Sequence, residues 1–185
     1  AEVEKLTGKA AKADHIASRT IRAINVKINE DPIYYKNLSA LIRETIESYR
    51  LERILEAEYL KKVKELEAEF LSGKRKNVPD ELNGNETGIA IYNLVKDVFK
   101  EELAFKTEIA VEIAVEIDSI IKSIVYEDEI LIIDWQNKTD IEGKIKIAID
   151  DYIFDLKAKY DLDIAFNQID DLVEQGLNIA KIKFV

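Results

Sequence analysis

The chain has 185 residues, a net charge of −10, 35% charged residues and 47% hydrophobic residues. This composition supplies enough apolar material for the core of one domain of ordinary size. We expect no membrane span, because no apolar run approaches about 20 residues, and no secretory signal, because no basic segment precedes an apolar run. The absence of Cys excludes disulfide and Cys-zinc scaffolds and fits a cytoplasmic protein.

The negative net charge favours protein partners over nucleic acid, because phosphate-binding surfaces need Lys and Arg. The only compact basic run is Lys74-Arg75-Lys76, which we interpret first as a solvated loop. The chain begins with Ala and contains no Met, so we expect it to be a piece of a longer chain or a processed product.

Helical periodicity dominates the N-terminal part. A helix of mixed character is expected over 9–29, and Asp31-Pro32 then ends it and starts another. Two apolar stripes follow at helical spacing, and two such helices so close in sequence predict an antiparallel hairpin that ends at Gly73. The stripes are Tyr35, Leu38, Ile42, Thr45 and Tyr49, then Tyr59, Val63, Leu66 and Phe70.

The segment 73–86 is rich in Gly, Asn and basic residues and predicts a linker loop between 1–72 and a C-terminal helical bundle at 87–185. The bundle is expected to contain helices at 87–102, 107–125, 140–160 and 164–182, with 107–125 the most buried. The apolar face predicted for the 140–160 helix is Ile141, Ile145, Ala148, Tyr152, Leu156 and Tyr160. Thr139-Asp140-Ile141-Glu142 has the form of a capping box. Ile130–Ile133 is either a short strand or a buried turn. The predicted fold is all-α, a helical bundle with a hairpin at its N-terminal side, compact enough to form one domain.

No catalytic, cofactor-binding or metal-binding residue is predicted. His15 is the only histidine, and no nucleophile-elbow pattern accompanies it. A di-metal carboxylate bundle needs two histidines, so Glu108, Glu112 and Glu116 are expected to form a solvated acidic face. Pro79-Asp80 and Glu142-Gly143-Lys144 match the letters of a nuclease motif, but on a helix the last acid and lysine point about 200° apart.

Trp135 is the sole tryptophan and stands outside the predicted helices. It is either a packing anchor that holds a loop on the bundle or a hot spot for a partner. The hypothesised partner interface comprises the surface around it, the polar face of the 140–160 helix and the 72–86 loop. Its candidate residues are Trp135, Asp134, Gln136, Lys74, Arg75 and Lys76.

Three ordered blocks of the sequence resemble the C-terminal helical region of the restriction subunit of type I restriction–modification enzymes. The first block runs from Ala13-Asp14-His15-Ile16-Ala17-Ser18-Arg19 through Asp31-Pro32-Ile33-Tyr34-Tyr35-Lys36 and Glu47-Ser48-Tyr49-Arg50 to Glu58-Tyr59-Leu60. The second is Ala90-Ile91-Tyr92-Asn93-Leu94, and the third runs from Asp134-Trp135 through Asp150-Asp151-Tyr152 to Asp171-Leu172. One departure is Leu55, where family members often place a Ser or Thr helix cap.

The resemblance implies a parent ATP-dependent DNA translocase and endonuclease that uses ATP and Mg²⁺ and assembles with methyltransferase and specificity subunits. Its nuclease and motor domains would precede this region, so the fragment itself would not be an enzyme. The resemblance further implies that this region docks the motor subunit onto the methyltransferase–specificity core. Two alternatives stay open: a brace for the motor domains of the same chain, and direct DNA contact through Lys74, Arg75 and Lys76.

Overall fold

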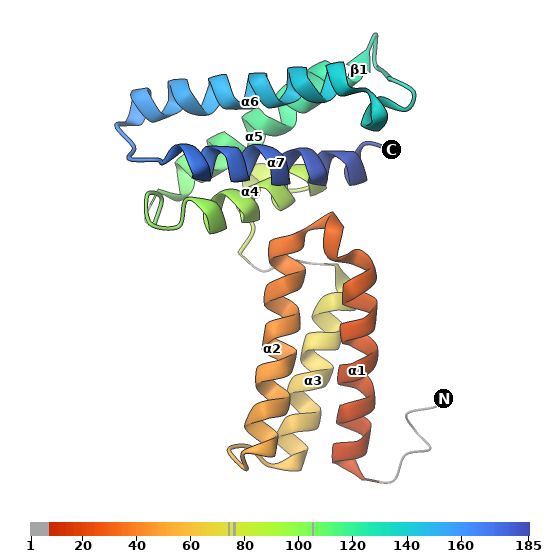
Figure 1. The fold of residues 1–185 in the computed structure, drawn as a ribbon. Coiled ribbons are helices and arrows are strands. Elements are labelled where there is room, and N and C mark those ends of the chain that lie inside the picture. The colour runs from red at the N-terminus through yellow and green to blue at the C-terminus, as the bar shows by residue number, and fades with distance from the viewer. Residues whose placement is uncertain (1–7, 74, 76, 105) are drawn as a thin grey trace. The chain divides into compact units, whose positions relative to one another are not determined.

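The computed structural model describes residues 8–73, 75, 77–104 and 106–185. Within these residues the chain forms seven α-helices and one small antiparallel hairpin, and 78% of it is helical (Figure 1). The predicted all-α fold is therefore confirmed. In the described part of the chain, no helix is both long enough and apolar enough to cross a membrane.

The chain divides into two compact units. The first comprises residues 1–28 and 34–77, and the second comprises residues 29–33 and 78–185. Each unit has its own hydrophobic core, a division that chain length alone does not indicate.

The first unit contains α1 (Lys9–Lys27), most of α2 (Pro32–Arg50) and α3 (Glu56–Ser72). The rings of Tyr35 and Phe70 lie 6.2 Å apart, and those of Tyr49 and Tyr59 stack at 4.6 Å. The start of α2 thus lies beside the end of α3, and its end beside the start of α3, which confirms the predicted antiparallel hairpin. Gly73 ends α3 as expected, with φ 63° and its N–H donating to the Phe70 carbonyl.

Helix α1 packs on α3 through polar bonds as well as apolar contacts. The hydroxyl of Tyr59 donates to the Asp14 carboxylate at 2.7 Å, and the backbone N–H of Ala10 donates to the Glu56 carboxylate at 2.6 Å. Burial, followed by the bond to Asp14, raises the pKa of Tyr59. The Glu56 carboxylate also satisfies one of the free amides that begin α1. The core residues of this unit are Ala13, Ile16, Ala17, Ile24, Tyr35, Leu38, Ile42, Tyr59 and Val63.

The second unit is built from α4 (Glu86–Val98), α5 (Thr107–Val125), α6 (Thr139–Tyr160) and α7 (Phe166–Lys183). Helix α4 packs on α5 and α7, and α6 packs on the same two helices, so the four surround one core. Strands β1 (Tyr126–Glu127) and β2 (Ile130–Leu131) project between α5 and α6 (Figure 1). Short 3-10 turns occur at Asp80–Leu82 and Trp135–Asn137.

Two sequence predictions about helix burial are wrong. Eight of the 13 residues of α4 are buried, against seven of the 19 in α5, so α4 is the more buried helix. Helix α6 turns a row of aliphatic side chains to the core, whereas the predicted face included Ala148, Tyr152 and Tyr160, which are half-buried. The buried row is Ile141, Ile145, Ile149, Ile153 and Leu156.

The predicted capping box at Thr139 is also wrong. Thr139 is the first helical residue of α6, the residue before it is Lys138, and no side chain caps this end. The Glu142 carboxylate accepts from the ammonium group of Lys181 on α7 at 2.6 Å, so it joins two helices instead of capping one.

The start of α4 depends on a buried polar network. Asn85 caps the helix by accepting from the Gly88 N–H at 2.9 Å, and its amide donates to the Asp118 carboxylate of α5 at 2.7 Å. A Cβ atom at Gly88 would lie 2.7 Å from the Asn85 side-chain nitrogen, so only glycine leaves room for this cap. The same carboxylate accepts from Lys122 at 2.6 Å.

Truncating a buried aliphatic side chain of α5 should destabilise the second unit. Ile117 is 1% exposed, so Ile117→Ala should lower the free energy of unfolding by about 2–4 kcal/mol in urea titrations. Ile147 is 64% exposed, and Ile147→Ala is the matched control, with an expected change below about 1 kcal/mol. Equal losses in the two variants would contradict the assigned core.

The contact between α5 and the end of α6 should depend on pH. Glu112 accepts from Lys159 at 2.8 Å and from the Tyr160 hydroxyl at 2.6 Å, and these bonds, that of Lys159 first, lower its pKa. Because the folded-state pKa is lowered, the stabilisation is present above the unfolded-state pKa of about 4.3 and is lost as pH falls through the folded-state pKa.

Glu112→Gln should therefore reduce the free energy of unfolding at pH 7 by about 1 kcal/mol or less. The difference from the unsubstituted chain should shrink in urea titrations carried out progressively below about pH 4. Glu108→Gln, at an exposed position one turn earlier in α5, provides the control. A difference that stays constant with pH would contradict this role for Glu112.

Candidate functional site

The segment between α5 and α6 forms a tight, projecting hairpin. Tyr126 pairs with Leu131 and Glu127 pairs with Ile130, which leaves Asp128 and Glu129 as the two turn residues. Their φ angles are 48° and 66°, as both central positions of a type I′ turn require. Such turns usually contain Asn-Gly, so the acidic pair here occupies an uncommon backbone conformation.

Trp135 anchors the return of this hairpin to the bundle. Its ring is fully buried, and its indole N–H donates to the Phe184 carbonyl at 2.8 Å. The side-chain amide of Gln136 donates to the same carbonyl at 2.8 Å. The ring of Tyr126 meets that of Phe184 edge to face at 6.2 Å. Both ends of the hairpin are thereby fixed to the residue that follows α7.

Two large apolar side chains of the hairpin segment face solvent. Ile130 is 71% exposed and Ile133 is 85% exposed, although the residues between them are half-buried. Side chains of this size gain about 1.5–3 kcal/mol when they are fully buried, so burying either one against a partner would stabilise a complex. We call the segment Tyr126–Asp134 the docking hairpin.

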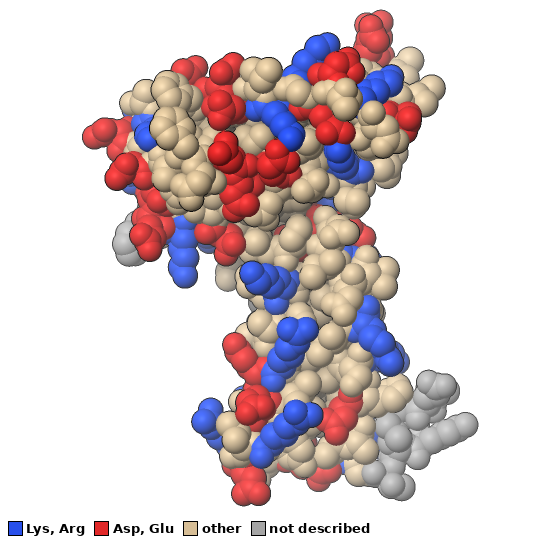
Figure 2. Space-filling model, in the orientation of Figure 1, with Lys and Arg blue, Asp and Glu red and all other residues tan. Residues whose placement is uncertain are grey.

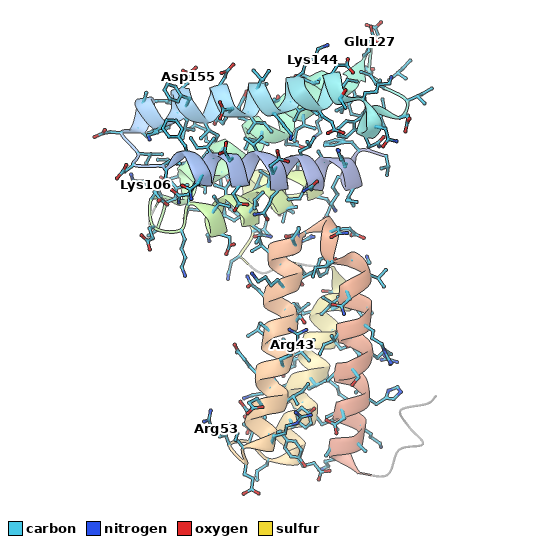
Figure 3. The ribbon with its side chains drawn as sticks, viewed as in Figure 1. Arg43, Arg53, Lys106, Glu127, Lys144 and Asp155 are labelled. Carbon is cyan, nitrogen blue, oxygen red and sulfur yellow. The ribbon has the colours of Figure 1, made fainter. Side chains whose placement is uncertain are left out.

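Carboxylates flank these apolar side chains in the sequence. Glu127, Asp128 and Glu129 are exposed at the tip and Asp134 is exposed at the base, and Glu127 extends away from the helices (Figure 3). Among the described residues, no cation lies within ion-pair distance of these four. The docking hairpin therefore combines exposed apolar side chains with exposed carboxylates that are unpaired among the described residues.

The interface residues predicted from the sequence differ in burial, and two of them lie outside the described residues. The ring of Trp135 is fully buried, so it is a packing anchor that holds the hairpin and offers no exposed surface of its own. Asp134 is exposed and accepts from the Asn137 side chain at 2.7 Å, whereas Gln136 is half-buried. The guanidinium of Arg75 lies 5.0 Å from the centre of the Tyr34 ring, and Lys74 and Lys76 lie outside the described residues.

Sequence reasoning missed Ile130 and Ile133 as exposed residues, because an apolar run of four reads as a buried strand or turn. The available signal was the acidic run Glu127-Asp128-Glu129 before it and Asp134 after it, which is unusual around a core strand. In the described part of the chain, hairpin included, no group of three or more His, Asp or Glu residues could hold a metal ion.

No protein-family model, curated protein or solved structure matches this chain.

The contribution of the Trp135–Phe184 hydrogen bond to the free energy of unfolding should be measurable with a conservative substitution. Trp135→Phe keeps an aromatic ring but removes the indole N–H, so it should lower the free energy of unfolding by about 1–3 kcal/mol through a lost donor and a smaller ring. Trp135→Ala should cost about 3–5 kcal/mol. Urea titration followed by circular dichroism is the measurement, and a Trp135→Ala variant as stable as the unsubstituted chain would contradict the anchor.

Proposed function

We propose that this chain is a non-catalytic helical domain that docks a larger subunit onto a protein partner. The observation that carries the proposal is the exposed apolar pair Ile130 and Ile133, held out on a hairpin that the buried Trp135 fixes in place. Apolar side chains at the centre of a polar rim are the usual composition of a protein interface. The residues that flank the pair are acidic, so the partner surface should combine apolar contacts with Lys and Arg.

The resemblance to the type I restriction subunit makes the proposal specific. The chain would be the C-terminal assembly region of an ATP-dependent DNA translocase and endonuclease, and its partner would be the methyltransferase–specificity core. ATP and Mg²⁺ would be bound by motor and nuclease domains elsewhere in the parent chain. The acidic, helical second unit supports an assembly role, since its charge suits a basic protein surface better than a phosphate backbone.

The docking experiment is a titration of the chain against its cognate methyltransferase–specificity complex, followed by analytical ultracentrifugation. We expect saturable co-sedimentation, weakened at least tenfold by the double substitution Ile130→Ser and Ile133→Ser, because loss of a hot-spot pair costs about 2 kcal/mol or more. The matched control is Val26→Ser with Leu41→Ser, at exposed apolar positions of the first unit, 85% and 48% exposed respectively. The control should bind as the unsubstituted chain does.

Two outcomes would count against the proposal in different ways. Equal binding by the hairpin variant and the unsubstituted chain would remove the docking hairpin from the interface. No complex at about 100 µM, an affinity weaker than about −5.5 kcal/mol, would remove docking itself. Bracing of the motor domains would then be the better explanation, and deletion of this region from the parent chain would impair ATP hydrolysis.

A further inference from the structure

The net charge of −10 is the sum of the net charges of the two units, which have opposite signs. The first unit contains 16 Lys and Arg against 11 Asp and Glu, a net charge of +5, and the second contains 11 against 26, a net charge of −15. Figure 2 shows Lys and Arg along the visible face of the first unit and Asp and Glu over much of the second. The kind of partner that each unit can bind must therefore be considered separately.

Helix α1 is the source of much of the positive charge in the first unit. It contains five Lys or Arg residues and one acidic residue, Asp14, whose carboxylate is already bonded to Tyr59. Four of its side chains, Lys12, His15, Arg19 and Arg22, follow one another at intervals of three, four and three residues. This spacing places them on one face of the helix.

Three carboxylates near this face pair with cations, and a fourth, that of Glu56, accepts a backbone N–H and keeps its charge. Glu67 pairs with Arg19, Glu65 with Lys61 at 3.9 Å and Glu58 with Lys62 at 3.0 Å, while Glu56 accepts the Ala10 N–H. Four cations have no carboxylate within ion-pair distance among the described residues. They are Lys9, Lys12, Arg22 and Lys64.

A shallow groove joins the start of α1 to α3 and continues this positive surface. Lys9 lines it from α1, and Lys61, Lys64 and Glu65 line it from α3, with Glu65 paired to Lys61. Ala57, Leu60 and Ala68 complete the lining, and the exposed part of α1 beyond it presents Ser18, Arg22 and Asn25. Hydroxyl, amide and guanidinium groups donate hydrogen bonds to phosphate oxygens.

We propose that this basic face, formed by α1 and the adjoining side of α3, binds the phosphate backbone of a nucleic acid. Lys9 and Arg22 are 13 residues apart, so the cations extend over about 20 Å of helix, comparable to about six base pairs of duplex. The polar side chains between them would position the backbone, and no base reading is implied. This binding activity is independent of the docking hairpin and goes beyond the proposed function.

A nucleic acid fits this face better than an acidic protein. A stable protein interface needs apolar side chains that become buried on binding, such as the exposed Ile130 and Ile133 of the docking hairpin. The row from Lys12 to Arg22 contains no Leu, Ile, Phe, Tyr or Trp side chain facing outwards, whereas phosphate binding needs only cations and donors.

The test uses the full chain and a fluorescein-labelled duplex DNA of about 20 base pairs, followed by fluorescence anisotropy across a KCl series. We expect binding at about 50 mM salt that weakens steeply as salt rises, with a log–log slope of about −3 to −4 for four phosphate contacts. Substituting Lys9, Lys12, Arg22 and Lys64 by Gln should weaken binding at least tenfold and bring the slope close to zero.

The matched control substitutes Lys100, Lys106, Lys138 and Lys144 by Gln; these four residues are exposed in the second unit, and Lys144 is labelled in Figure 3. Both variants have the same net charge, so the control should retain affinity within about threefold if position matters more than total charge. Circular dichroism melts should show both variants folded, and an RNA duplex of the same sequence distinguishes DNA from RNA as the preferred backbone.

Three results would overturn the proposal. The first is no binding of either duplex at about 100 µM chain and 50 mM salt, where non-specific binders are readily saturated. The second is an equal loss of affinity in the two variants. The third is salt-sensitive self-association that the α1–α3 substitutions abolish without any nucleic-acid binding, which would assign the face to an acidic protein surface.

Discussion

The Phe184 carbonyl oxygen accepts the two hydrogen bonds that hold the hairpin between α5 and α6 against the second unit. A backbone carbonyl has two lone pairs, and here the indole of Trp135 and the amide of Gln136 each use one. The buried indole N–H would cost about 1–3 kcal/mol if it lost its acceptor, so the ring and the residue after α7 must stay together. The hairpin between α5 and α6 takes its position from that requirement, and so does the exposure of Ile130 and Ile133.

Much of the fold follows from periodicity. The break at Asp31-Pro32, the hairpin of α2 and α3, the glycine end of α3 and the bounds of α5 could all be predicted, because each has a local physical cause. The predictions that failed required tertiary information. Thr139 and Glu142 match a capping box in their letters, but Lys181 on another helix competes for the Glu142 carboxylate. The rotation of α6, which buries Ile149 and Ile153, is set by which helices it packs against.

The candidate surfaces were harder to predict than the helices. Trp135 is the sole tryptophan and was a candidate interface residue, yet its ring is buried and positions its neighbours. The exposed Ile130 and Ile133 lie in a segment that the sequence left undecided between a short strand and a buried turn. The net charge of the whole chain also gave no sign that the first unit is basic, because a total charge does not show where the charged residues lie. When each unit is considered by itself, the exposed apolar and acidic side chains of the second unit and the basic face of the first suggest two different kinds of partner.

The single buried tryptophan also makes the second unit spectroscopically distinct. The first unit has tyrosines but no tryptophan, so indole emission excited near the red edge of absorption reports only on the environment of Trp135. Far-ultraviolet circular dichroism, in contrast, averages over helices of both units. If the two signals change together during denaturation, the units unfold as one cooperative system; if they separate, each unit has its own transition. The chain thus contains an intrinsic optical label for one of its two halves, with no dye attached.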